Sequence, residues 1–106
     1  MASNALSQLA EDARRTPGTL YVFPDWGFFA SFALLTENKI PYILDPAAIE
    51  TARGASESVV VAFWNDRDES KYTGLLMQAG ARETATMTYR QRDGRPAFLI
   101  IRASFR

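Results

Sequence analysis

Three short runs of β-branched and aromatic residues divide the first two thirds of the chain. They cover residues 19–23, 42–44 and 59–64, and a turn-forming pair that contains aspartate follows each of them at once. Such runs between turn residues are typical of strands. The third run is continuously apolar, which predicts a central strand that is covered on both faces.

Helical spacing appears before the first run and after the third. A stripe at i, i+3, i+4 and i+7 predicts the first helix, and it consists of Leu6, Leu9, Ala10 and Ala13. A second stripe predicts the fourth helix, and it consists of Tyr72, Leu75, Leu76 and Ala79. We expect this fourth helix to begin near Asp66 or Asp68 and to end at Gly80, because glycine commonly closes a helix.

The second and third helices are predicted mainly from their ends. Residues 26–35 form an apolar stretch directly after Asp25, which we expect to be the N-cap of the second helix. Asn38 can take the left-handed conformation that closes this helix. Asp45 followed by Pro46 is a typical N-cap and first-turn pair, and it predicts a short third helix.

From Ala81 onward apolar and polar positions alternate, which predicts two antiparallel strands. Asp93-Gly94 is a favoured two-residue hairpin turn. Pairing Arg92 with Arg95 across that turn sets the register. The same register places Tyr89 opposite Phe98 and Met87 opposite Ile100.

The element order α-β-α-β-α-β-α-β-β predicts an α/β fold. Strands joined by helices are parallel, with right-handed crossovers. We therefore expect a small, mostly parallel sheet with helices on both faces and a C-terminal antiparallel β-hairpin. Residues 6–106 are expected to form one domain, whereas residues 1–5 contain Ser-Asn-Ala and read as a remnant of tag removal or a disordered start.

The composition narrows the classes of function. The 106 residues include 12 basic and 12 acidic ones, and this neutral balance argues against nucleic-acid binding, which depends on neutralising phosphates. The chain has no cysteine and no histidine, so thiolate chemistry and the commonest metal ligand and general base are missing. We expect no cofactor, no metal site and no catalytic residue. No segment has the roughly 20 apolar residues of a membrane helix, and the start lacks the apolar core of a signal peptide.

Candidate ligand-binding residues follow the predicted strands. The carboxyl ends of parallel strands share one edge of a sheet, and ligands tend to bind there. This edge would gather Asp25, Trp26, Asp45, Trp64, Asn65 and Asp66. Carboxylates accept hydrogen bonds from sugar hydroxyls and indole rings stack on sugar faces, whereas carboxylates with an amide suit Ca²⁺ or Mg²⁺. The simpler interpretation is that each aspartate caps the helix after it.

The second predicted helix, residues 26–35, is apolar nearly all round. A helix of this kind is most often buried in the core of its own domain. The alternative is that one side of it packs on another domain or on a partner close to a membrane.

Two segments carry a resemblance to a known family. Phe23-Pro24-Asp25-Trp26-Gly27, then an apolar helix and Lys39-Ile40-Pro41-Tyr42, resemble the soluble C-terminal extracytoplasmic domain of some bacterial multi-pass membrane glycosyltransferases. These enzymes are relatives of protein O-mannosyltransferases and of the aminoarabinose transferase of lipid A, and they use polyprenyl-phosphate sugars. The resemblance covers roughly residues 16–66.

The resemblance implies an accessory domain without activity of its own, because the catalytic carboxylate of the family lies between transmembrane helices and no position here matches it. The implied partners are the transmembrane part of the parent protein or another domain, with a sugar or polyprenyl-phosphate sugar as ligand. The implied location is the periplasmic face of the inner membrane; without the resemblance we expect a cytoplasmic protein. The alternatives are a free-standing small-molecule or protein-binding module and a Mg²⁺-dependent phosphoryl-transfer domain.

Overall fold

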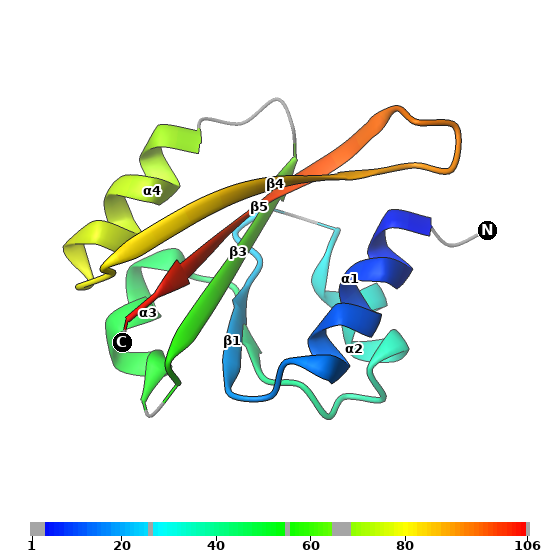
Figure 1. The fold of residues 1–106 in the computed structure, drawn as a ribbon. Helices are drawn as coiled ribbons and strands as arrows, with labels where there is room; N and C mark the ends of the chain where they lie inside the picture. Colours follow the sequence, from blue (N-terminus) through cyan, green and yellow to red (C-terminus); the bar gives the residue numbers. More distant parts are fainter. Residues whose placement is uncertain (1–3, 26, 55, 65–68, 106) are drawn as a thin grey trace.

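The computed structural model describes residues 4–25, 27–54, 56–64 and 69–105 (Figure 1). The described helices are α1 (Asn4–Arg15), α2 (Phe29–Leu35), the 3₁₀ helix η1 (Pro46–Ala48), α3 (Ile49–Arg53) and α4 (Glu69–Gln78). The described strands are β1 (Thr19–Val22), β2 (Tyr42–Ile43), β3 (Ser58–Trp64), β4 (Glu83–Arg90) and β5 (Pro96–Ser104). The expected α/β fold is confirmed, and helix α1 takes in the last two of the first five residues, with Ala5 fully buried.

The sheet is mixed, so the expectation of a mostly parallel sheet is wrong. Its order is β2-β1-β3-β5-β4, with parallel pairs between β1 and each of β2 and β3. Strand β5 runs antiparallel to both β3 and β4. The hairpin therefore joins the sheet through its second strand, and it pairs along more of its length than the short β1 and β2 do. The prediction that β3 is the central strand is confirmed.

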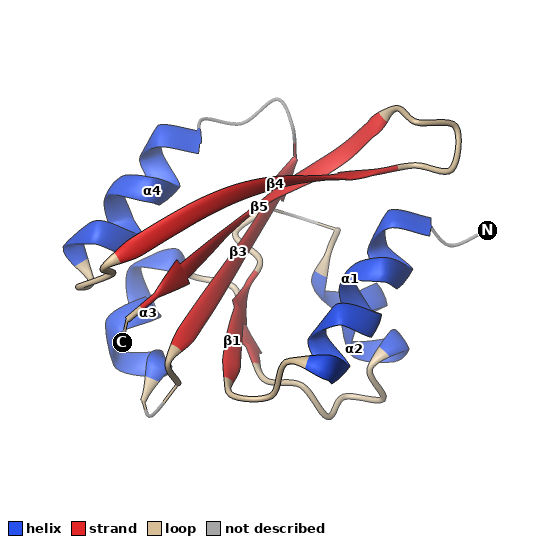
Figure 2. Cartoon of the chain, viewed as in Figure 1, coloured by secondary structure: helices blue, strands red, loops and turns tan. Residues whose placement is uncertain are grey.

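Helices cover both faces of the sheet, as Figure 2 shows, and each face has its own apolar core. One core joins α1 and α2 to the sheet through Leu9, Phe32, Tyr21, Phe23 and Phe98. The other joins α3 and α4 to the opposite face through Ile49, Tyr72, Leu76, Val61 and Phe63. The alternation of strand side chains divides β3 between them, which explains why its sequence is apolar at every position from Val59 to Trp64.

The two predicted helical stripes lie against the sheet. All four residues of the first stripe in α1 are buried. In α4, Tyr72 and Leu76 are buried, and Leu75 and Ala79 pack against the same core. Gly80 follows α4 with a φ of 102°, the left-handed conformation that glycine adopts most readily.

Helix α2 is shorter than predicted, and Asp25 is not its N-cap. The helix begins at Phe29 with Phe28 in the cap position, and no side chain caps it. Phe32 is fully buried, whereas Leu34 is 80% exposed, so α2 has one face in the core and one face in solvent. The expected left-handed Asn38 is confirmed by its φ of 57°, and its amide donates to the Ala33 carbonyl at 2.7 Å.

The hairpin has the predicted register but not the predicted turn. The Gln91 amide donates to the Arg95 carbonyl at 2.8 Å, and Gly94 donates back to Gln91 at 2.9 Å. The loop thus has three residues, Arg92 to Gly94, instead of two, which shifts the register by one. A bulge at Ala97 shifts the register back, so Tyr89 still faces Phe98 and Met87 faces Ile100.

Glu37 closes α2 in a conformation that suits glycine better. Its φ is 55°, which costs an L-residue about 1–2 kcal/mol. We expect Glu37→Gly to raise the free energy of unfolding by about 0.5–1 kcal/mol, because the relief of strain exceeds the added freedom of the unfolded chain. Urea unfolding would measure this. Glu37→Ala is the matched control: it removes the exposed ion pair to Lys39 but keeps the strain, so a gain there would contradict the explanation.

None of the described helices has the length and hydrophobicity to cross a membrane.

Candidate functional site

Asp25 ties three elements together at the carboxyl ends of β1 and β3. The Trp64 amide at the end of β3 donates to Asp25 Oδ2 at 2.9 Å. The Tyr72 hydroxyl of α4 donates to Oδ1 at the longer distance of 3.5 Å. The predicted meeting of Asp25 and Trp64 at one sheet edge is therefore confirmed, and this carboxylate serves as an acceptor for groups of its own chain.

Trp64 is half-buried and packs on the aromatic core. Its ring lies 4.2 Å from the Phe28 ring with an interplanar angle of 27°, and Phe28 in turn meets Phe98 edge-on at 5.1 Å. Gly27, with a φ of 101°, lets the chain turn beside this stack, and a Cβ there would lie 3.4 Å from the indole. One indole face is thus taken by Phe28.

Asp45 has the cap role that its sequence predicts. Its Oδ1 accepts a hydrogen bond from the Ala47 amide at 2.9 Å, with Pro46 at the first helical position of η1. The side chain is exposed and follows the edge strand β2. The other candidates, Trp26, Asn65 and Asp66, lie outside the described residues. Within the described ranges, no three acidic residues are grouped to hold a metal ion.

A second carboxylate contact was not predicted from the sequence. The Tyr89 hydroxyl of β4 donates to Asp12 Oδ2 of α1 at 2.6 Å. The Tyr89 ring is buried and stacks on Phe98 at 5.2 Å. Burial, and then the hydrogen bond and negative charge of Asp12, raise the pKa of the Tyr89 hydroxyl. The available signal was the position of Asp12 beside Ala13 and three residues after Leu9, which places it at the border of the buried stripe.

The raised pKa of Tyr89 makes a pH-dependent contribution to stability. Its ordinary value is 10.0, and the folded chain holds the proton more tightly than the unfolded chain does. This contribution is therefore complete below pH 10 and is lost as the pH rises above 10. We expect Tyr89→Phe to cost about 1.5 kcal/mol at pH 7 and the gap to narrow by up to about 1.4 kcal/mol per pH unit above pH 10. Urea unfolding from pH 7 to 11 would measure it, and a constant gap would contradict it.

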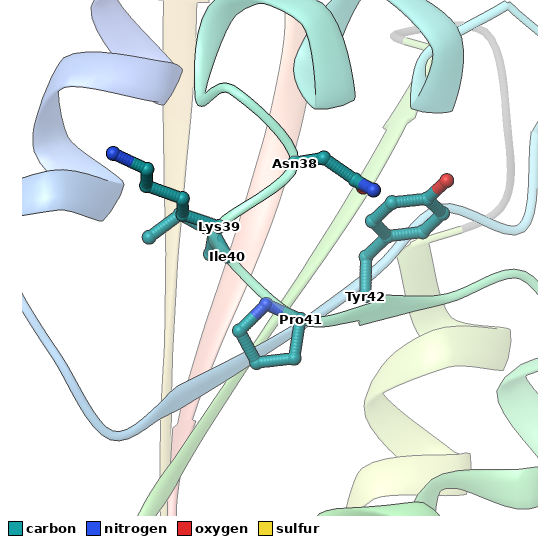
Figure 3. A pocket seen from close by; sticks show the side chains of 5 residues that line it. All are labelled: Asn38, Lys39, Ile40, Pro41 and Tyr42. Carbon is teal, nitrogen blue, oxygen red and sulfur yellow. The ribbon is translucent and has the colours of Figure 1, made fainter.

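Two surface hollows lie away from the strand-end residues. One, of about 500 Å³, is lined by Asn38, Lys39, Ile40, Pro41 and Tyr42. Figure 3 shows the Asn38 amide directed toward the Tyr42 ring, whereas Lys39 extends to the other side. The other, of about 470 Å³, lies between α1 and the hairpin and is lined by Gln8, Asp12 and residues 87–92. Neither hollow includes any of the predicted ligand-binding residues.

Comparison with protein-family models, with curated protein sequences and with solved structures found no match to this chain.

Proposed function

We propose that the chain is a non-catalytic accessory domain of a larger, membrane-associated glycosyltransferase-like protein, on the periplasmic side of the inner membrane. The motif that carries the resemblance lies at the turn after β1, where Asp25 bonds to the Trp64 amide. A carboxylate that accepts hydrogen bonds from its own chain suits a structural role. This observation carries the proposal that the motif maintains the fold of an accessory domain and performs no chemistry.

The outer face of α2 supports docking to the transmembrane part of the parent protein or to another of its domains. Leu34 is 80% exposed and Ala30 is exposed on the same helix, whereas Phe32 is buried. An exposed leucine on a helix whose other face is anchored in the core gives such a contact a rigid base.

The ligand of this proposal is a sugar or a polyprenyl-phosphate sugar, bound at the strand ends. Asp25 and Trp64 lie together there, joined by the hydrogen bond from the Trp64 amide to the Asp25 carboxylate. The edge combines a carboxylate with an aromatic ring, which is the pairing that suits a sugar.

Two experiments test the proposal. We expect an NMR titration with monosaccharides and a short polyprenyl phosphate to shift the signals of Asp25 and Trp64 while those of the hairpin stay fixed. Shifts of other signals, or no shifts at all, would contradict the binding of this ligand at the strand ends. The length and hydropathy of the native reading frame test the accessory role: upstream membrane-spanning segments would support it, and a frame of about the length of this chain would contradict it.

A free-standing protein-binding module is the second candidate, and the exposure of Leu34 favours it as well. The length and hydropathy of the native reading frame distinguish this candidate function from that of an accessory domain. The phosphoryl-transfer alternative requires Asp25 and Asp66 at metal-bridging distance, and Asp66 lies outside the described residues. An increase in melting temperature with Mg²⁺ would favour that alternative, because a ligand that binds only the folded state stabilises it.

A further inference from the structure

Strand β4 forms a long edge of the sheet without the usual protection. It is the last strand in the order, and no other described strand pairs with its outer side (Figure 2). It is eight residues long, and residues 84–88, Thr-Ala-Thr-Met-Thr, carry no charge. Four of these five residues are exposed. Edge strands in natural proteins are usually short, charged or interrupted by proline, because an open edge pairs with other strands.

The hydrogen-bonding groups on this outer edge come from alternate residues. The Phe105 amide donates to the Glu57 carbonyl, so the odd-numbered residues of β5 bond to β3 and the even-numbered ones to β4. In β4, the odd-numbered residues therefore bond to β5. The amides and carbonyls of Thr84, Thr86 and Thr88 point outward, with one residue between each.

We propose that β4 pairs antiparallel with β4 of a second copy of this chain, about a two-fold axis at Met87. In this register Thr86 bonds to Thr88 of the second copy, and Thr84 bonds to its Arg90. Each of these hydrogen-bonded pairs joins residues whose backbone amides and carbonyls point outward. Met87, which is 49% exposed, meets Met87 of the second copy and is covered by it.

Charge complementarity supports a second copy of the chain as the occupant of this edge. Thr86 donates its hydroxyl to Glu69 Oε2 of α4 at 2.9 Å, so a carboxylate lies beside the outer edge. Arg90 of the second copy stands diagonally across from Thr86 on the same face, within reach of a long side chain. Arg90 uses one of its five donors on the Gly94 carbonyl, and others can bond to Glu69. Because of the two-fold axis, the ion pair between Glu69 of one copy and Arg90 of the other forms twice in the dimer.

A cysteine variant tests the register directly, because the chain has no cysteine of its own. Opposed residues in a non-hydrogen-bonded pair have Cα atoms about 4.5 Å apart, which is within the range for a disulfide. We expect Met87→Cys to give a covalent dimer on mild oxidation. Ala85→Cys is the matched control. Residue 85 faces Tyr89 of the second copy, so the two residues at position 85 are offset along the strands and do not face each other. Cross-linking of Ala85→Cys but not of Met87→Cys would overturn the register, and cross-linking of neither would overturn the pairing.

Sedimentation equilibrium over a concentration series tests the edge itself. We expect the unmodified chain to dimerise and Thr86→Pro to be monomeric, because proline removes an outward amide without losing a bond to β5. Met87→Lys, which brings two like charges together, is a second variant with the same expected loss. A monomeric unmodified chain, or dimers that both variants leave intact, would overturn the proposal.

The ion pair has its own test by charge reversal. Glu69→Arg and Arg90→Glu should each weaken the dimer by about 2- to 30-fold, the range expected for two exposed ion pairs. The double variant should restore it. If the double variant is as weak as either single one, Glu69 does not face Arg90 of the second copy and the register is wrong.

Discussion

Replacing Phe32 by alanine should lower the free energy of unfolding by about 3–5 kcal/mol, the range for removing a buried phenylalanine. Phe32 is fully buried in the middle of α2. Its ring lies 4.8 Å from that of Phe23 and 5.1 Å from that of Tyr21, so it joins α2 to β1. Alanine favours the helix, and the loss therefore reports the packing of the ring and the cavity left behind.

Leu34→Ala is the matched control on the same helix. The Leu34 side chain is 80% exposed, and its removal should change stability by less than about 0.5 kcal/mol. Urea unfolding followed by circular dichroism would measure both variants. A similar loss at both positions would contradict the division of α2 into a core face and a solvent face, and it would also remove the basis for docking through Leu34.

Replacing Asp25 by alanine should have the second largest effect, a loss of about 2–3 kcal/mol in the free energy of unfolding. The Trp64 amide loses its charged acceptor, and the Tyr72 hydroxyl loses a weaker contact. The link between β1, β3 and α4 is then broken. Asp25→Asn retains the shape and one acceptor oxygen, so we expect it to cost about 1 kcal/mol.

Asp45→Ala supplies the comparison for Asp25. Its carboxylate caps a short 3₁₀ helix at an exposed position, so its removal should cost only about 0.5 kcal/mol. Unfolding curves of the three aspartate variants under one set of conditions would decide the order. If Asp25→Ala were no more costly than Asp45→Ala, the Asp25 carboxylate would have little structural role and would be a stronger candidate for binding a ligand.

The strand-end residues show how much of the candidate site can be predicted from the sequence. The pattern predicted that Asp25 and Trp64 meet, because consecutive parallel strands bring their carboxyl ends to one edge. It also predicted the cap at Asp45. It assigned the same cap role to Asp25, and that assignment is wrong, because a nearby backbone amide from β3 competes for the carboxylate. The pattern places the two residues at one edge, but the bond between this carboxylate and a distant backbone amide has no local signature.

The hairpin shows the same division between local and distant information. Alternation predicted both strands and the facing of Tyr89 with Phe98, since both rings point to the core. The three-residue turn and the bulge at Ala97 followed from no visible signal. Two one-residue shifts cancel, so the buried pairs keep the register that the core requires while the chain near the turn departs from it.

The sequence by itself determined the elements of this protein: which segments are helices and strands, which residues of α1 and α4 are buried, and that β3 lies at the centre. These follow from periodicity and end signals, which act over a few residues. The tertiary structure decided that the sheet is mixed, that β5 and not β4 lies beside β3, that α2 has an exposed face, and that Asp12 meets Tyr89. These features depend on packing between segments far apart in the chain, where hydrogen-bond partners and buried area are set by the whole fold.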